Sequence, residues 1–436
     1  EPKTVQVARQ GEANKVSFDL EMESVMKNMF RSLAGRDFRL FFFGQIVSLI
    51  GTWVQQVALS WIAYRVTGSA FMLGLIAFSG QIPMLLVTPT GGMLADRFSR
   101  RDILLAMQLV EMSVAVLLAV LAFFDEFSPW VLIAASVVLG IAGAIEMPSR
   151  QAFVTEILHD RRHMSNAIAL NSLTFNVARL AGPAVAGVIL ALFSEAACFA
   201  ANALSYLAAI YTLLAIHPRN RAPSSGTGSL WEGVAYLRQF APAGWLVITV
   251  SLASFCISPF MTFMPVYAKD IFHGGPDMLG TLMSASGFGA LLAALYLARR
   301  KTVAGLGNFI VGGCFLSGIA AIAFSYNQLL TLALPLLVVS GSSFIIILTS
   351  CNILLQSMVP EPLRGRVMAL YTMAFLGMLP IGSLVMGALA HWAGAQGTFL
   401  LSGVAALGMG YVLLRRLPQL RKEAHPILSQ KGLLSE

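Results

Sequence analysis

Charged side chains are scarce in this sequence. Asp, Glu, Lys and Arg together make up 11% of its 436 residues, whereas apolar residues make up 57%. A typical soluble domain has about 25% charged residues. Because so little polar surface is available to cover a core of this size, the composition excludes a water-soluble globular protein and favours a membrane protein.

Residues that carry enzyme or metal chemistry are few and dispersed. The four cysteines show no C-x-x-C spacing, which excludes a predicted disulfide framework or metal site. The six histidines occur in no H-E-x-x-H motif, and no G-x-S-x-G is placed for chemistry. We therefore expect no enzyme, no metal and no cofactor. The net charge of +8 lies mostly in short loops, so membrane orientation explains it and we expect no nucleic-acid partner.

Apolar stretches of about 20 residues, long enough to cross a bilayer core of about 30 Å, recur through the chain. They predict an all-α membrane protein whose twelve helices occupy 38–64, 71–95, 102–124, 130–154, 165–192, 196–216, 243–268, 277–298, 303–324, 329–356, 366–390 and 396–414. The predicted division is a tail at 1–37, a bundle at 38–216, a linker at 217–242, a bundle at 243–414 and a tail at 415–436.

Amphipathic spacing at 18–33 and 229–240 predicts two helices that lie on the membrane surface. The Pro-, Ser- and Gly-rich stretch 218–228 separates the twelve helices into six and six. With both termini in the cytoplasm, nearly all Lys and Arg residues fall on the cytoplasmic side, as the positive-inside rule requires.

The two halves repeat each other faintly. At an offset of 200 residues, Gly182 and Gly187 align with Gly382 and Gly387, and residues 72–74 resemble residues 278–280. Such internal repeats build pseudo-symmetric bundles around a midplane site in transporters.

A charged turn at 92–104 separates the second and third predicted helices. Its main residues are Gly92, Asp96, Arg97, Arg100 and Arg101. The turn resembles the loop signature G-x-L-A-D-R-x-G-R-K-x-x-L of the major facilitator superfamily, with Ser99 replacing the second Gly. The resemblance implies the major facilitator fold, two pseudo-symmetric six-helix bundles, in a monomer that works by alternating access.

The resemblance also implies that Asp96 meets the N-terminus of the eleventh helix when the cavity closes to the cytoplasm. A helix N-terminus carries partial positive charge, which stabilises a nearby acid. The hypothesis is an inner gate formed by Gly92, Asp96, Arg97, Arg100, Arg101, Glu361, Arg364 and Arg366. The alternative is a solvated loop that obeys the positive-inside rule, which explains the arginines but not the acid.

Residues 178–187 resemble the G-x-x-x-G-P-x-x-G-G element in the fifth helix of exporters in this superfamily. They match it at Gly182, Pro183 and Gly187. Small residues permit tight helix packing, and proline bends a span. The match favours export, with generic helix packing as the alternative.

Four ionisable residues stand out within predicted spans, where a charge is costly: Glu111, Glu146, Arg150 and Arg179. In one hypothesis Glu146, or Glu111, binds a proton and is coupled to the cargo and to Arg179. In the other, a permanent Glu–Arg pair holds helices four and five together. We favour a structural role for Glu111, because the third helix is expected at the periphery. Residues 134–140 lack the arginine that proton-coupled relatives often have there.

The first, second, seventh and tenth helices supply candidate cavity residues, and Pro259 and Pro265 are expected to break the seventh. These are Trp53, Gln55, Gln56, Gln81, Phe255, Met261, Phe263, Tyr267, Asn352 and Gln356. Aromatic and methionine surfaces with a few amides suit a mid-sized amphipathic organic cargo.

Residues 148–167 and 360–367 resemble the branch that includes enterobactin-type siderophore exporters and macrolide efflux proteins. That resemblance implies export from the cytoplasm across a bacterial inner membrane, with proton antiport as one driving force. The alternatives are a lipid or lysophospholipid flippase and a transition-metal exporter, the latter suggested by Cys256, Met261 and Met264. A passive membrane scaffold is disfavoured by the acid in the charged turn. Besides the cargo, we expect membrane lipids as partners.

Overall fold

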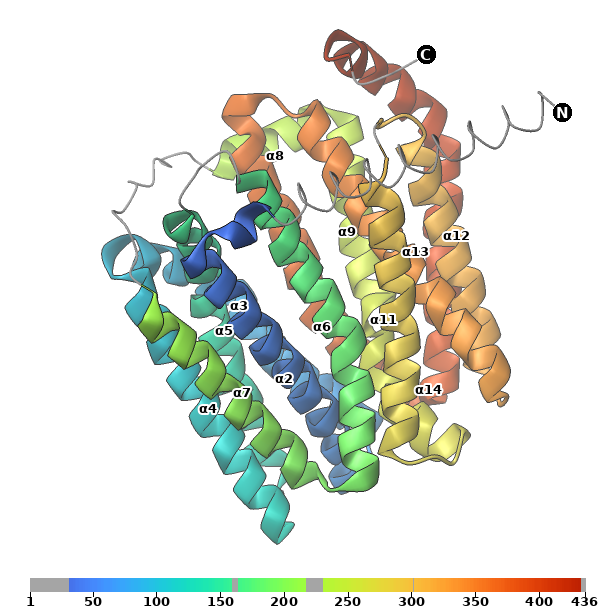
Figure 1. Ribbon diagram of the computed structural model, residues 1–436. Coiled ribbons are helices and arrows are strands. Elements are labelled where there is room, and N and C mark those ends of the chain that lie inside the picture. The colour runs from blue at the N-terminus through green and yellow to red at the C-terminus, as the bar shows by residue number, and fades with distance from the viewer. Residues whose placement is uncertain (1–30, 159–163, 217–229, 301, 433–436) are drawn as a thin grey trace, which may run out of the picture.

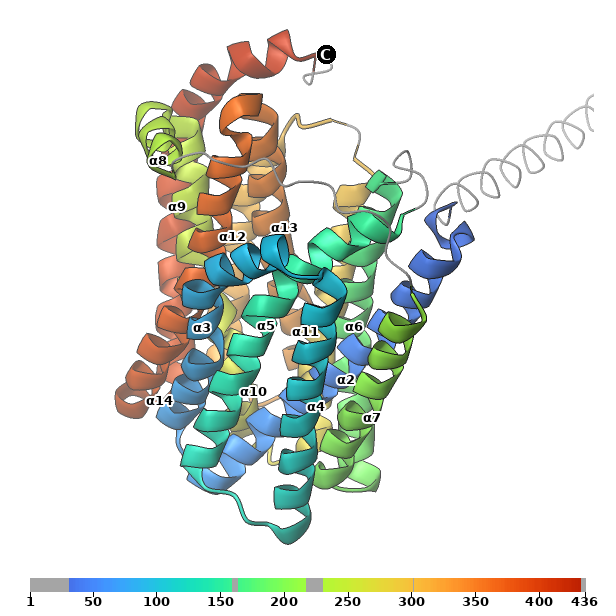
Figure 2. The same cartoon turned by 90° about the vertical axis from the view of Figure 1, so that its left-hand side faces the viewer.

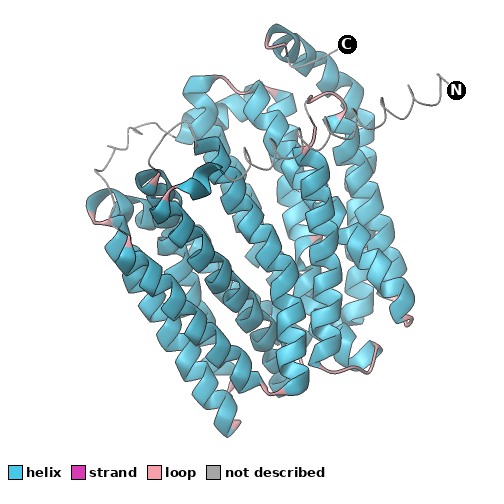
Figure 3. Cartoon of the chain, viewed as in Figure 1, coloured by secondary structure: helices cyan, strands magenta, loops and turns pink. Residues whose placement is uncertain are grey.

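The computed structural model of the protein describes residues 31–158, 164–216, 230–300 and 302–432, and the regular structure within them is helical (Figures 1 and 3). Eleven of the described helices are long and apolar enough to cross a membrane. The last, α14, contains two crossings, which brings the total to the twelve that the sequence predicts.

The first half of the chain forms one bundle. Its helices are α2 (Arg36–Thr67), α3 (Ala70–Arg97), α4 (Arg100–Phe124), α5 (Pro129–Ile157), α6 (Met164–Leu192) and α7 (Glu195–Ala215), preceded by the short 3-10 helix η1 (Arg31–Ala34). The predicted surface helix at 18–33 lies almost wholly outside the described residues, as does the linker 218–228.

The second half forms the other bundle. Its helices are α9 (Ala241–Cys256), α11 (Pro276–Ala298), α12 (Leu306–Ser325), α13 (Leu330–Met358) and α14 (Glu361–Gln430). The short helix α8 (Leu230–Gln239) lies between the halves in sequence, where the second surface helix is predicted.

Serine side chains fix where several helices begin. The hydroxyls of Ser69, Ser128 and Ser194 accept hydrogen bonds from backbone N–H groups at the starts of α3, α5 and α7. Ser99 accepts one from the Asp102 N–H and caps α4 in the same way. The residue that departs from the superfamily signature therefore has a role of its own, as the N-cap of the third crossing.

The seventh crossing is interrupted. After α9 come the 3-10 helix η3 (Ser258–Phe263), the single turn α10 (Met264–Val266) and the π-helical turn η4 (Tyr267–Ile271). Proline lacks a backbone N–H and clashes with the preceding helical turn. Pro259 and Pro265 therefore break this helix, as the sequence predicts.

A bend at Gly394 separates the two crossings of α14. Gly394 has a φ of 70° and a ψ of 168°, which L residues with side chains rarely adopt. The second leg continues past residue 414 to Gln430, so most of the predicted C-terminal tail is helical.

Apolar side chains cover the outside of the bundles. Leu117 of α4, Leu207 of α7, Ile319 of α12 and Val404 of α14 are each about half exposed. Such exposure would be unfavourable in water, whereas lipid chains solvate these residues.

Two helix pairs join the bundles. α3 lies beside α14, and α6 lies beside α11 (Figure 2). The described chain starts at Arg31 and finishes at Gly432 at the same end of the molecule (Figure 1). We call this the tail end and the opposite one the far end.

Candidate functional site

Glycines bring the two bundles into backbone contact near the far end. Gly74 of α3 meets Gly387 of α14, and Gly187 of α6 meets Gly280 of α11. A Cβ atom on Gly280 would lie 2.7 Å from the Gly187 Cα, and one on Gly74 would lie 3.0 Å from the Gly387 Cα. These glycines belong to the segments that repeat between the halves. The repeat therefore produces two equivalent crossings that close the space between the bundles at the far end.

A hydrogen bond adds to this closure. The Tyr64 hydroxyl of α2 donates to the Asp270 carboxylate of η4, 206 residues away and in the other bundle. The Lys269 ammonium lies 5.6 Å from the centre of the Tyr64 ring. We call Tyr64, Lys269 and Asp270 the far-end latch. The sequence analysis missed it, because no local pattern relates the end of α2 to an interrupted helix in the other half.

Tyr64→Phe should favour the conformation in which the far end is open. Loss of a hydrogen bond to a charged group costs about 1.5 kcal/mol or more, so the closed population should fall by about tenfold relative to the open one. Spin labels on the exposed far-end residues Trp130 and Trp392, each first replaced by Cys, would report the separation of the bundles. Tyr326→Phe, at the same end, is the control. Identical distance distributions in both variants would exclude the latch.

The tail end lacks the contacts that the inner-gate hypothesis requires. Asp96 is exposed, and its carboxylate forms no hydrogen bond or ion pair with any described residue. Glu361 and Arg97 are exposed as well. Arg366 pairs with Glu232 of α8, within its own half. A Cβ on Gly92 would meet nothing within 4 Å. No hydrogen bond or ion pair between described side chains therefore joins the predicted gate residues of the two bundles in this conformation.

Two of the predicted gate arginines bond within the first bundle instead. Arg100 forms a buried ion pair with Glu156 of α5 at 2.8 Å. Arg101 donates to the carbonyls of Leu213 and Leu214 at the end of α7, at 2.7 and 3.0 Å. These bonds fix the ends of α4, α5 and α7 to one another. Arg100 and Arg101 therefore hold the bundle together and do not reach across to the other half.

At the far end of the first bundle, Arg65 has a comparable role. It pairs with Asp125 at 2.7 Å and with Glu195 at 2.8 Å. The guanidinium lowers the pKa of the exposed Asp125 carboxyl. Together with the arginine bonds at the tail end, this ties the first bundle at both ends.

The buried charges of the first bundle form one network. Gln108 donates to the Glu146 carboxylate at 3.1 Å, and Arg150 reaches the same oxygen at 3.4 Å. Glu111 is buried and lies near the Glu146 carboxyl and the Tyr206 hydroxyl. Although α4 is on the outside of the bundle, Glu111 thus faces its interior. The interior of the first bundle therefore holds two neighbouring carboxyls, Glu111 and Glu146, beside one guanidinium, Arg150.

Arg150 connects this network to neighbouring helices. It donates to Gln45 of α2 at 3.3 Å, and its guanidinium lies 4.9 Å from the centre of the Phe175 ring on α6. Arg179, by contrast, forms no ion pair in the described part of the chain and lies where α6 crosses α11 at Gly287. In this conformation Arg150, and not Arg179, is the cation that pairs with Glu146, and the coupling of Glu146 to Arg179 stays a prediction.

Three predicted cavity residues are buried within a bundle instead. Gln55 accepts a hydrogen bond from Asn202 at 2.8 Å. Phe263 and Tyr267 are almost fully buried, and Tyr267 donates to the Ser325 carbonyl at 2.9 Å. These predictions were wrong because the helices are apolar around their whole circumference, so periodicity cannot identify the cavity face.

The other cavity candidates keep accessible surface. They are Trp53, Gln56, Gln81, Phe255, Met261, Asn352 and Gln356. Trp53 packs over Gly182 of α6. A Cβ atom added to Gly182 would lie 2.3 Å from the Trp53 Cβ atom. The Gln356 amide donates to Asn352 at 2.6 Å. The Gln81 Oε1 atom is buried and has no hydrogen-bond partner among the described residues, so a donor group of a cargo could satisfy it.

Comparison with known proteins covers nearly the whole chain. The model of the family described as transmembrane secretion effector matches residues 28–431. The staphyloferrin A transporter of Staphylococcus aureus is 26% identical over 373 residues, which is 85% of this chain and 93% of the relative. Macrolide efflux protein A of Streptococcus pyogenes is 25% identical over 401 residues, with coverage of 85% and 93%.

A solved structure has the same fold. A bacterial homologue of the human lysosomal transporter Spinster, in an inward-facing and unoccupied conformation, superposes with a TM-score of 0.70. It covers 92% of this chain and 99% of its own, at 13% sequence identity. At this low sequence identity, the similarity shows a shared arrangement of the helices and nothing beyond the fold.

Proposed function

Because the chain belongs to the transmembrane secretion effector family of major facilitator transporters, we propose that it exports a mid-sized amphipathic organic compound by alternating access. Two relatives support this class of cargo, since their names are those of a siderophore transporter and a macrolide efflux protein. The accessible tryptophan, methionine and amide side chains between the bundles suit such a compound.

The observation that carries the proposal is that the bundles touch at the far end, whereas no ion pair between described residues joins them at the tail end. The tail end holds the charged turn and the start of α14, so the positive-inside rule assigns it to the cytoplasm. The protein is then an inward-open monomer in a bacterial inner membrane, with both termini in the cytoplasm.

Closure of the tail end brings Asp96 to the N-terminus of α14. There Asp96 would lie next to Glu361, Arg364 and Arg366. The Arg364 Nε atom is buried and has no hydrogen-bond partner among the described residues, so its N–H group is available to donate to the Asp96 carboxylate. Asp96 also gains the partial positive charge of the helix end. The inner gate would then form in one conformation and the far-end latch in the other.

Proton antiport supplies the driving force in this proposal. Glu111 and Glu146 are two buried carboxyls with a single guanidinium, Arg150, within the network. Binding one proton balances this charge, and releasing it leaves an uncompensated anion, which is costly in a buried site. Arg179 provides a positive charge at the crossing of the bundles, where an anionic group of the cargo can bind.

The second candidate is a flippase for a lipid or lysophospholipid, which the same amphipathic surfaces would suit. A transition-metal exporter has less support, because the described residues contain no group of three His, Cys, Asp or Glu side chains that could hold an ion. Reconstituted protein should move macrolides or carboxylate siderophores faster when a pH gradient is imposed. Movement of labelled lysophospholipid without movement of either organic compound would favour the flippase.

Asp96→Asn should reduce transport by about tenfold or more, while membrane insertion stays normal. The variant loses an ion pair and a helix-terminal contact that form in the outward-open state, together worth about 1–2 kcal/mol. Asp102→Asn is the matched control, since Asp102 is exposed in the same turn and follows Ser99 on α4. Wild-type transport rates in the Asp96 variant would remove this residue from the gate.

A further inference from the structure

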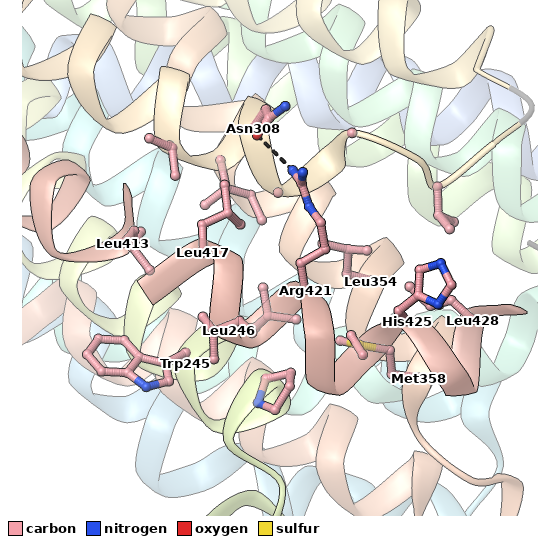
Figure 4. A pocket seen from close by; sticks show the side chains of 18 of the residues that line it. Trp245, Leu246, Asn308, Leu354, Met358, Leu413, Leu417, Arg421, His425 and Leu428 are labelled. Atoms are coloured by element: carbon pink, nitrogen blue, oxygen red, sulfur yellow. Dashed lines mark hydrogen bonds between the residues drawn. The ribbon is translucent and has the colours of Figure 1, made fainter. Parts of the chain in front are cut away.

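A cavity of about 330 Å³ lies at the tail end of the second bundle, apart from the space between the bundles. It is enclosed by α9, α12, α13 and the second leg of α14 (Figure 4). Apolar side chains such as Trp245, Leu246 and Leu354 form most of its wall. Arg421 and His425 stand on one side of it, next to each other along α14 (Figure 4).

The cavity exists because α14 does not stop at the end of its crossing. The last part of the helix, which contains Pro418 and Pro426, turns across the end of the bundle (Figure 1). Its Ala424 and Leu428 side chains are buried against Met358, with Leu246 packed around them. These contacts hold the helix above the ends of α9 and α13, and a space remains between them.

The wall of this cavity has a charge as well as an apolar surface. The Arg421 guanidinium donates to the neutral Asn308 amide at 3.0 Å, and it forms no ion pair with a described carboxylate. The surrounding stretch 416–431 contains three further basic residues, Arg416, Lys422 and Lys431, and a single acid, Glu423. Glu423 accepts a hydrogen bond from Gln419. The segment of α14 around the cavity therefore has a net positive charge.

We propose that this cavity binds an anionic phospholipid of the leaflet at the tail end. One acyl chain lies among Trp245, Leu246 and Leu420, and the phosphate contacts Arg421 and His425. The apolar wall would hold the acyl chain. The Arg421 guanidinium, which has no ion-pair partner among the described residues, would attract the negative headgroup, and a zwitterionic lipid would gain less from this attraction. The lipid would join the end of α14 to α9 and α12. This site is separate from the transported cargo and does not depend on the proposed function.

The test uses the purified full-length protein and phosphatidylglycerol, with phosphatidylcholine of the same chains for comparison. Native mass spectrometry should show selective retention of phosphatidylglycerol by the wild type. Arg421→Gln should weaken that retention about fivefold, the loss expected for one cation beside an anionic headgroup. Arg415→Gln is the control, because Arg415 contacts Tyr411 outside the cavity. Equal retention of the two lipids by the wild type, or equal losses in both variants, would overturn the proposal.

Two further measurements separate a lipid from other ligands. Leu420→Trp fills the cavity while leaving its charges in place, so it should also reduce retention of phosphatidylglycerol. Unchanged retention would mean that no acyl chain enters. Inorganic phosphate should not raise the thermal stability of the wild type as phosphatidylglycerol does. An equal rise with phosphate would identify a site for a small anion and contradict the proposed lipid.

Discussion

Gly280→Leu should abolish transport, while the protein should still insert and fold. A Cβ at this position lies 2.6 Å from the Pro183 carbonyl oxygen and 2.7 Å from the Gly187 Cα. Both neighbours are backbone atoms, which cannot rotate away as a side chain can. Overpacking of this kind costs about 1–3 kcal/mol. Since the clash exists only where α6 and α11 touch, the variant avoids it by keeping the far end open, and the cycle stops there.

Gly74→Leu should have the same effect, because Gly74 occupies the equivalent crossing between α3 and α14. Gly408→Leu is the control, since a Cβ there meets nothing within 4 Å. Transport of a labelled compound and the distance between labels at the far end are the two measurements. Full transport by the Gly280 variant, or an equal loss in the Gly408 variant, would show that the crossings do not separate during the cycle.

Glu146→Gln should uncouple transport from the pH gradient. Glutamine resembles a carboxyl that is permanently protonated, so Glu111, Gln108 and Arg150 keep a hydrogen-bonding partner. Uphill transport driven by a pH gradient should fall by about tenfold or more, while downhill flux continues. Counterflow in proteoliposomes separates the two, because exchange of cargo across the membrane needs no net proton movement.

Glu156→Gln is the matched control for that variant. Glu156 lies on the same helix and forms a buried ion pair with Arg100, outside the network of Glu111, Glu146 and Arg150. Its loss should lower thermal stability, because breaking a buried pair leaves one charge without its partner. The pH dependence of transport should not change. If wild type and Glu146→Gln respond identically to pH, the Glu146–Arg150 pair is structural only.

The fold could be predicted from the sequence to a large extent. Membrane helices are long and apolar by necessity, so all twelve crossings were identifiable, and Pro259 and Pro265 revealed the interruption of the seventh. The repeat of Gly187 and Gly387 was visible too. What the sequence could not provide was the partner of each glycine, because the two contacts join segments far apart in the chain.

The site was less predictable, for a physical reason. Helices buried in both lipid and protein are apolar on all sides, so Gln55 and Tyr267 could not be assigned to a face. Both Arg150 and Arg179 were possible ion-pair partners of Glu146, because only the packing of the helices determines which guanidinium lies near it. The Tyr64–Asp270 bond depends wholly on tertiary packing.

The attachment of α8 has a consequence for the energy of switching. Gly233 of α8 packs against Arg366 and Leu370, and Glu232 pairs with Arg366, so this helix travels with the second bundle. In the proposed cycle Arg366 exchanges one carboxylate, Glu232, for another, Asp96. An exchange between similar partners changes the free energy little in either direction. Neither conformation is then much more stable than the other. Binding of cargo or of a proton is therefore enough to reverse the equilibrium between them.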